Sequence, residues 1–171
     1  ENHIVYGNLG SILQMKGDIQ NSITYFKKAL QLKNNYPIAH YNLGNAFAAC
    51  GDLTSAITSL KTALKLKPNY SDAYNNLGIA FRECGDLDEA LANHKKAIDL
   101  EPENSQAFYG LGRVQEVKGN LKDSKLSFHK AVELNPTNTS ALFQLSKDIE
   151  SDEDSRDLAK KLEKIKAEKG A

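Results

Sequence analysis

A period of 34 residues runs through the sequence and limits its fold more than any other feature. The stretch AHYNLGNAFAACGDLTSAITSLKTALKLKPN, from Ala39, matches AYNNLGIAFRECGDLDEALANHKKAIDLEPE, from Ala73, after a shift of 34 residues and without an insertion. Internal repeats of roughly 20 to 50 residues are the signature of repeat architectures, in which one supersecondary unit is copied along the chain. The chain should therefore consist of one structural unit repeated several times.

Each unit carries two glycines at a fixed spacing. Leu-Gly occurs at the same place in four units, and a second glycine follows seven residues after the first. The Leu-Gly glycines are Gly10, Gly44, Gly78 and Gly112, and the later glycines, each followed by Asp or Asn, are Gly17, Gly51, Gly85 and Gly119. We expect the later glycine to end one helix in the left-handed conformation and the following acid or amide to cap the next helix. Each unit is thus predicted to be helix, tight turn, helix and break.

The second half of each unit has recurring residues of its own. Small residues stand at Ala56 and Ala90, bulky residues at Phe26, Leu60 and Phe128, alanines at Ala29, Ala63, Ala97 and Ala131, and closing prolines at Pro68, Pro102 and Pro136. Together with the Leu-Gly and Gly-Asp pairs, this pattern resembles the tetratricopeptide repeat family. The resemblance implies an all-α fold, a right-handed superhelix or α-solenoid built from helix pairs.

Four full repeats are predicted, at residues 3–36, 37–70, 71–104 and 105–138. Departures from the family pattern are few. His94 replaces the bulky residue of the third repeat, Ser22 and Ser124 replace the small alanine, and His40 replaces the aromatic residue of a first helix. We expect these replacements to cost local packing rather than the fold.

The repeat pattern fails after a fifth first helix, which is predicted at residues 139–150. Beyond the acidic stretch SDEDS, Leu158, Leu162 and Ile165 lie at helical spacing, which predicts a charged amphipathic helix over 155–169. Solenoids need a polar-faced cap over their last exposed core, and this helix fits that role. We predict a single domain, 1–171, of about 4.5 repeats with a C-terminal capping helix. Because the sequence begins at Glu1 in mid-pattern and without methionine, we expect it to be excised from a longer chain.

The charges of the chain balance. There are 22 Lys and Arg residues against 22 Asp and Glu, which gives a formal net charge of zero. Such a chain has no global field that would attract nucleic acid or an anionic membrane surface. Its longest apolar runs are also far short of the roughly 20 residues that a membrane span needs. We therefore expect neither nucleic acid nor membrane as a partner, and we expect a cytoplasmic location.

The sequence offers no constellation of residues for catalysis. Its two cysteines, Cys50 and Cys84, belong to no CxxC or Cys/His cluster, and its four histidines occupy different repeat positions. A metal site is therefore not expected. No nucleophile elbow, phosphate loop or pair of carboxylates at catalytic spacing is present. We predict a protein without catalytic residues, metal or cofactor, and thus not an enzyme.

In the tetratricopeptide superhelix that the pattern resembles, one stripe of each first helix lines the inner, concave wall. Counting 100° per residue places the second, sixth, ninth and thirteenth positions of each repeat on that stripe, with the fifth and twelfth beside it. Residues at these positions are the candidates for peptide binding. They are Asn8, Tyr41, Asn42, Asn45, Asn75, Asn76, Ile79, Arg82, Tyr109 and Arg113.

Asparagine occupies the sixth position three times in succession, as Asn8, Asn42 and Asn76. A primary amide has one acceptor and two donors, so it can pair with both the C=O and the N–H of an extended peptide. The row is similar to the asparagine ladder in the repeat domain of O-linked N-acetylglucosamine transferase, which implies grip on peptide backbones. The alternative is that these amides bond only to the adjacent helix or to water. Gly110 breaks the row, which would leave Tyr109 and Arg113 to select side chains.

The sequence therefore predicts a protein-protein interaction scaffold that binds an extended peptide or a helix in its concave groove. One alternative is the substrate-presenting arm of a larger enzyme, of glycosyltransferase or sulfotransferase type, because arrays that resemble this one precede such domains. Another is self-assembly into a homo-oligomer through the uncapped N-terminal repeat.

Overall fold

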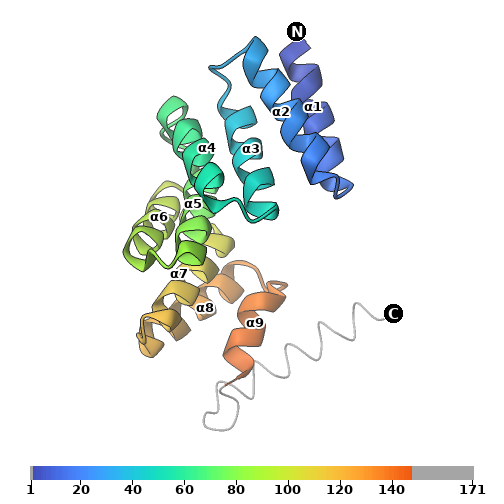
Figure 1. The fold of residues 1–171 in the computed structure, drawn as a ribbon. Coiled ribbons are helices and arrows are strands. Elements are labelled where there is room, and N and C mark those ends of the chain that lie inside the picture. The colour runs from blue at the N-terminus through green and yellow to red at the C-terminus, as the bar shows by residue number, and fades with distance from the viewer. Residues whose placement is uncertain (1, 148–171) are drawn as a thin grey trace, which may run out of the picture. The chain divides into compact units, whose positions relative to one another are not determined.

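The computed structural model describes residues 2–147, and every regular element in that range is an α-helix (Figure 1). The helices are α1 (Asn2–Met15), α2 (Ile19–Leu32), α3 (Pro37–Ala49), α4 (Leu53–Leu66), α5 (Ser71–Cys84), α6 (Leu87–Leu100), α7 (Ser105–Val117), α8 (Leu121–Leu134) and α9 (Thr139–Ser146). The predicted all-α solenoid of helix pairs is confirmed. The predicted cap at 155–169 and the end of the predicted helix 139–150 lie outside the described residues.

Contacts divide the chain into two compact units, the first from Glu1 to Leu100 and the second from Glu101 onward. In the first unit, α1 packs on α2, α3 on α4 and α5 on α6, so that each repeat is one helical hairpin. Helix α2 also packs on α3 and α4 on α5, while the first helices touch directly, α1 on α3 and α3 on α5. In the second unit, α7 and α8 form a hairpin and α9 packs on α8. The prediction of one domain over 1–171 stays a prediction.

The turn inside each hairpin follows the expected chemistry at most places. The later glycines all have positive φ, at 80° for Gly17, 83° for Gly51, 86° for Gly85 and 80° for Gly119. The Asp52 side chain accepts a hydrogen bond from Ser55 N at 3.0 Å, and Asp18 caps α2 in the same way. Asn120 makes no such bond, so the predicted cap is wrong at that helix.

Inside each hairpin, the Leu-Gly glycine lies under the bulky residue of the second helix. An ideal Cβ placed on Gly10 would lie 2.7 Å from Phe26 Cε1, and one on Gly78 would lie 2.9 Å from the His94 ring. A side chain at either glycine would therefore clash with a residue that is wholly buried. We call this arrangement the glycine socket. The four sockets pair Gly10 with Phe26, Gly44 with Leu60, Gly78 with His94 and Gly112 with Phe128.

Candidate functional site

The asparagine row of the first unit lies where first helices meet. Asn42 Nδ2 on α3 donates to Ser11 Oγ on α1 at 3.3 Å, and Asn76 Nδ2 on α5 donates to Asn45 Oδ1 on α3 at 2.8 Å. In both cases the sixth residue of one repeat bonds to the ninth residue of the repeat before it. The alternative reading of the row, in which the amides bond to the adjacent helix, therefore holds for Asn42 and Asn76.

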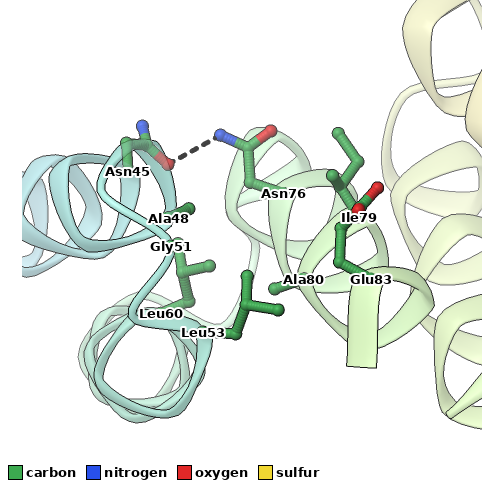
Figure 2. A pocket seen from close by; sticks show the side chains of 9 residues that line it. All are labelled: Asn45, Ala48, Gly51, Leu53, Leu60, Asn76, Ile79, Ala80 and Glu83. Atoms are coloured by element: carbon green, nitrogen blue, oxygen red, sulfur yellow. Dashed lines mark hydrogen bonds between the residues drawn. The ribbon is translucent and has the colours of Figure 1, made fainter. Parts of the chain in front are cut away.

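Asn76 is the centre of a small polar cluster. Its Nδ2 also donates to Tyr41 Oη at 3.1 Å, so both of its N–H groups are used. Figure 2 shows the Asn45 oxygen facing the Asn76 nitrogen, while the Asn45 nitrogen and the Asn76 oxygen lie on the side away from Leu53 and Leu60.

The cluster keeps hydrogen-bonding capacity for a ligand. Asn76 Oδ1 has two lone pairs, of which a distant contact from Asn75 Nδ2 at 3.5 Å takes one. Asn45 Nδ2 has two N–H groups, and the Tyr41 hydroxyl, which Asn45 also contacts, can take only one. One acceptor and one donor therefore remain side by side. We call Asn45 and Asn76 the amide pair.

The aromatic residues beside the amide pair keep their hydroxyls neutral. The Tyr41 and Tyr70 rings lie 4.8 Å apart, and Lys67 Nζ lies 4.1 Å from the centre of the Tyr70 ring. Burial is the main cause that raises the pKa of Tyr41, with the charge of Asp72 adding to it. Burial, the neighbouring Tyr41 and Asp72 together raise the pKa of Tyr70 to about 12. Tyr41 thus accepts from Asn76 as a neutral phenol at physiological pH.

A cavity of about 490 Å³ lies beside the amide pair, between α3, α4 and α5. Its lining is mostly apolar, with Asn45, Asn76 and Glu83 as the polar side chains. Figure 2 shows Leu53 and Leu60 on the opposite side of the cavity from the amide pair. The lining consists of Asn45, Ala48, Gly51, Leu53, Leu60, Asn76, Ile79, Ala80 and Glu83. We call this space the α3–α5 cavity, and its volume is in the range of small-molecule and side-chain pockets, roughly 300 to 1,000 Å³.

Three further candidates surround these groups without joining the cluster. Ile79 is 39% exposed and lines the α3–α5 cavity. Arg82 lies on the same helix and forms an ion pair with Glu83 at 2.6 Å. Asn8 is exposed on α1. The predicted groove residues of the first unit therefore lie together at Tyr41, Asn45, Asn76 and Ile79.

Asn75 does not occupy the predicted position. It is 7% exposed, and its Oδ1 lies 3.0 Å from Nδ1 of His94, which is wholly buried on α6. Because the amide oxygen accepts, the His94 proton lies on Nδ1. Burial, followed by the charge of Arg82, lowers the pKa of His94 to about 4, so the ring is neutral. The interpretation of Asn75 as an accessible groove residue is corrected, because its side chain partners the buried imidazole instead.

Tyr109 and Arg113 lie on α7, in the second unit. Arg113 Nη1 donates to Tyr109 Oη at 3.4 Å, and Arg113 Nε lies 3.1 Å from a carboxylate oxygen of Glu116. The Tyr109 ring lies 5.8 Å from that of Phe128. The two side chains therefore bond to each other and to their own hairpin. Their predicted role in selecting side chains stays a prediction.

Two features of the site escaped the sequence analysis. The first is the contribution of α4, because Leu53 and Leu60 were expected only to fill the core and not to line a cavity. The second is the pair formed by Asn75 and His94. A signal for that pair was readable, since the third repeat alone has asparagine at the fifth position and alone has histidine at the bulky position.

Other chemistry is not prominent in the described part of the chain. Among residues 2–147, no group of three or more His, Cys, Asp and Glu side chains lies close enough to hold a metal ion. Over the same range, no helix combines the length and the apolar character that crossing a bilayer requires. The amide pair and the α3–α5 cavity are therefore the best-formed candidate site.

Comparison with known families identifies tetratricopeptide repeats along most of the chain. A model described as "TPR repeat" matches residues 10–49 and 44–81. Two models described as "Tetratricopeptide repeat" match residues 71–104 and 105–138. No functionally curated protein matches the sequence significantly.

Among solved structures, the chain is similar to several MamA proteins. A structure titled "Crystal structure of MamA" is 26% identical, with a TM-score of 0.78, and the match covers 95% of this chain and 97% of that one. MamA from Desulfovibrio magneticus RS-1 is 23% identical with the same TM-score of 0.78, over 98% and 94% of the two chains. A third MamA structure is 25% identical with a TM-score of 0.75, over 96% and 90%. At such identities the likeness is one of fold.

Proposed function

Because this chain belongs to the tetratricopeptide repeat family, whose members bind protein partners, we propose that it is an interaction scaffold that grips an extended peptide through the amide pair. The observation that carries the proposal is the arrangement at Asn76. Its two N–H groups hold Tyr41 and Asn45, which fixes the amide and aims its oxygen and an Asn45 N–H outward.

An extended segment suits this arrangement better than a helix does. One free donor beside one free acceptor matches the C=O and N–H that each residue of an extended chain presents. The main-chain groups of a bound helix are already paired along its axis, except at its ends. Because the grip uses main-chain groups, it is tolerant of partner sequence. The chain itself is proposed to carry no catalytic role and to act in the cytoplasm.

The test uses a peptide selected from a random 12-residue display library against the purified chain. Each backbone N–H of that peptide is then replaced in turn by N-methyl. We expect one position at which methylation weakens binding about tenfold, as the loss of a hydrogen bond requires. The Asn76→Ala variant should bind the unmodified peptide about tenfold more weakly and should show no further loss at that position. Binding is measured by fluorescence anisotropy.

The matched control is Asn69→Ala, because Asn69 is an exposed asparagine of the loop before α5 and lies outside the cluster. It should bind like the wild type. Equal affinity of Asn76→Ala and wild type for the selected peptide, with unchanged melting temperatures, would sink the proposal.

Self-assembly through the first repeat is the second candidate, and one observation favours it. Val5 and Ile12 on α1 are 62% and 49% exposed. The residues 34 positions later, Ala39 and Ala46, are buried on α3, which packs against the preceding α2. Light scattering decides between the candidates, since self-assembly requires a mass that rises with concentration and falls back to the monomer in Ile12→Glu. The enzyme-arm alternative requires a catalytic domain in the parent reading frame.

A further inference from the structure

The α3–α5 cavity has no role in the grip on a peptide backbone described above. It opens beside the amide pair, and most of its lining is aliphatic, with Leu53, Leu60 and Ile79 as the large side chains. Leu60 is almost wholly buried, so the cavity reaches to the core of the second repeat. An aliphatic space of this depth is poorly hydrated, and its exchange of water for an apolar group is favourable.

We propose that the α3–α5 cavity is an anchor subsite that takes one uncharged apolar side chain of the bound peptide. This inference rests on the proposed grip by the amide pair and deepens it. A residue whose backbone C=O and N–H meet Asn45 and Asn76 projects its side chain from the same point, and the cavity begins at those two residues. The anchor residue is therefore of the leucine, isoleucine, methionine or phenylalanine kind.

Charge narrows the chemistry of the partner further. Glu83 lines the cavity, and its side chain is 52% exposed even though Arg82 pairs with it. Asp72 is exposed and close enough to raise the pKa of both Tyr41 and Tyr70. An acidic side chain at the anchor position would thus meet two carboxylates and a low-polarity cavity, which penalise a buried charge. Basic residues beside the anchor are favoured for the same reason.

Blocked amino acids test the subsite because each carries one C=O, one N–H and one side chain. The probes are the N-acetyl N′-methylamides of leucine, phenylalanine, glycine and aspartate, titrated into isotope-labelled protein and followed by two-dimensional NMR. We expect the leucine and phenylalanine probes to shift the side-chain amides of Asn45 and Asn76 and the signals of Ile79. Their affinity should exceed that of the glycine probe about tenfold or more, and the aspartate probe should bind most weakly.

Filling the cavity provides the decisive variant. Ala48 lines the cavity from an exposed position on α3, so Ala48→Leu places a larger side chain in the space without disturbing buried packing. The control is Ala49→Leu, the same substitution at the next residue, which is exposed and does not line the cavity. Ala48→Leu should reduce leucine-probe affinity about tenfold to the level of the glycine probe, whereas Ala49→Leu should leave it unchanged.

The outcomes separate this inference from the proposed function. Equal affinities of the leucine and glycine probes, or equal binding by Ala48→Leu and wild type, overturn the anchor subsite while leaving the backbone grip intact. If Asn76→Ala instead binds the leucine probe as well as the wild type does, and Ala48→Leu does not, the cavity takes apolar groups without the grip, and the proposed function fails.

Discussion

The two compact units solve the same junction between repeats with different residues. In the first unit, α3 and α5 begin after Tyr36 and Tyr70, neither of which caps its helix with a side-chain hydrogen bond. In the second unit, α7 and α9 begin after asparagines, and Asn138 Oδ1 accepts from Ala141 N at 3.1 Å. The tyrosines give up a helix cap, and their rings are free to pack elsewhere.

This difference decides what the fifth residue of a repeat can touch. Tyr41 in the first unit lies against the Tyr70 ring and accepts a hydrogen bond from Asn76. Tyr109 holds the same repeat position in the second unit, where the junction residue is Asn138. Its ring lies near Phe128 and its hydroxyl near Arg113. An aromatic junction thus builds a polar cluster between first helices, whereas an amide junction turns the tyrosine back onto its own hairpin.

The largest difference between the units should appear in acid, because His94 fills a socket in the first unit and Phe128 fills its counterpart in the second. The pKa of His94 is about 4 in the folded chain, against an ordinary value of 6.5. A pKa that folding lowers gives stability that is complete above the unfolded value and is lost as the pH falls. We expect the first unit to lose about 3 kcal/mol between pH 7 and pH 4. Hydrogen exchange at α5 and α6, compared with α7 and α8, measures it.

The control for this prediction copies the second repeat into the third. Asn75→Tyr with His94→Leu recreates the pair found at Tyr41 and Leu60 and removes the titrating group. The extra acid sensitivity of α5 and α6 should disappear in the double variant. Its persistence there would assign the effect to some other group.

The next largest effect should come from the junction of the second unit. Asn138 is 5% exposed, caps α9, and donates through Nδ2 to Ser105 Oγ at 3.0 Å. Asn138→Ala should lower the free energy of unfolding by about 2 kcal/mol, because a cap and a buried bond are lost together. Asn120→Ala is the matched control and should cost less than about 0.5 kcal/mol, since Asn120 precedes α8 without a side-chain cap bond. Chemical denaturation compares the two, and equal losses would contradict the assigned role of the cap.

The smallest change in stability should accompany an exchange of junction chemistry. Tyr70→Asn places a capping amide before α5 and removes the ring contacts with Tyr41 and Lys67. Each gain or loss is about 1 kcal/mol, so the free energy of unfolding should change by about 1 kcal/mol or less. The pKa of Tyr41 should fall toward its ordinary value of 10, because Tyr70 no longer buries it. NMR of labelled tyrosine follows this titration, and an unchanged pKa of Tyr41 would refute the coupling. Tyr36→Asn, at the other tyrosine junction, should leave Tyr41 unaffected.

The helices and turns could be predicted from the sequence because their signals are local. A glycine at positive φ and an aspartate that caps the following helix act within a few residues, and both recur at each period. Asn120 was an exception, because an asparagine before a helix predicts a cap only if its side chain turns toward the helix.

The site was harder to predict because it depends on contacts between helices. Counting 100° per residue put Asn75 beside the groove, at the edge of the face that packs on the second helix. A polar partner at that edge, His94, decided its orientation. The α3–α5 cavity depends on the relative sizes of side chains from three helices, which no face count contains.

The glycine sockets also bear on how such a chain can change over time. Each socket is closed by two residues of the same hairpin, so an unusual occupant such as His94 finds Gly78 and Asn75 within its own 34 residues. Duplication or loss of one hairpin would carry a complete set of matched residues with it, leaving only the contacts between hairpins to adjust. An array built this way can gain or lose length by recombination without first accumulating compensating substitutions in its neighbours.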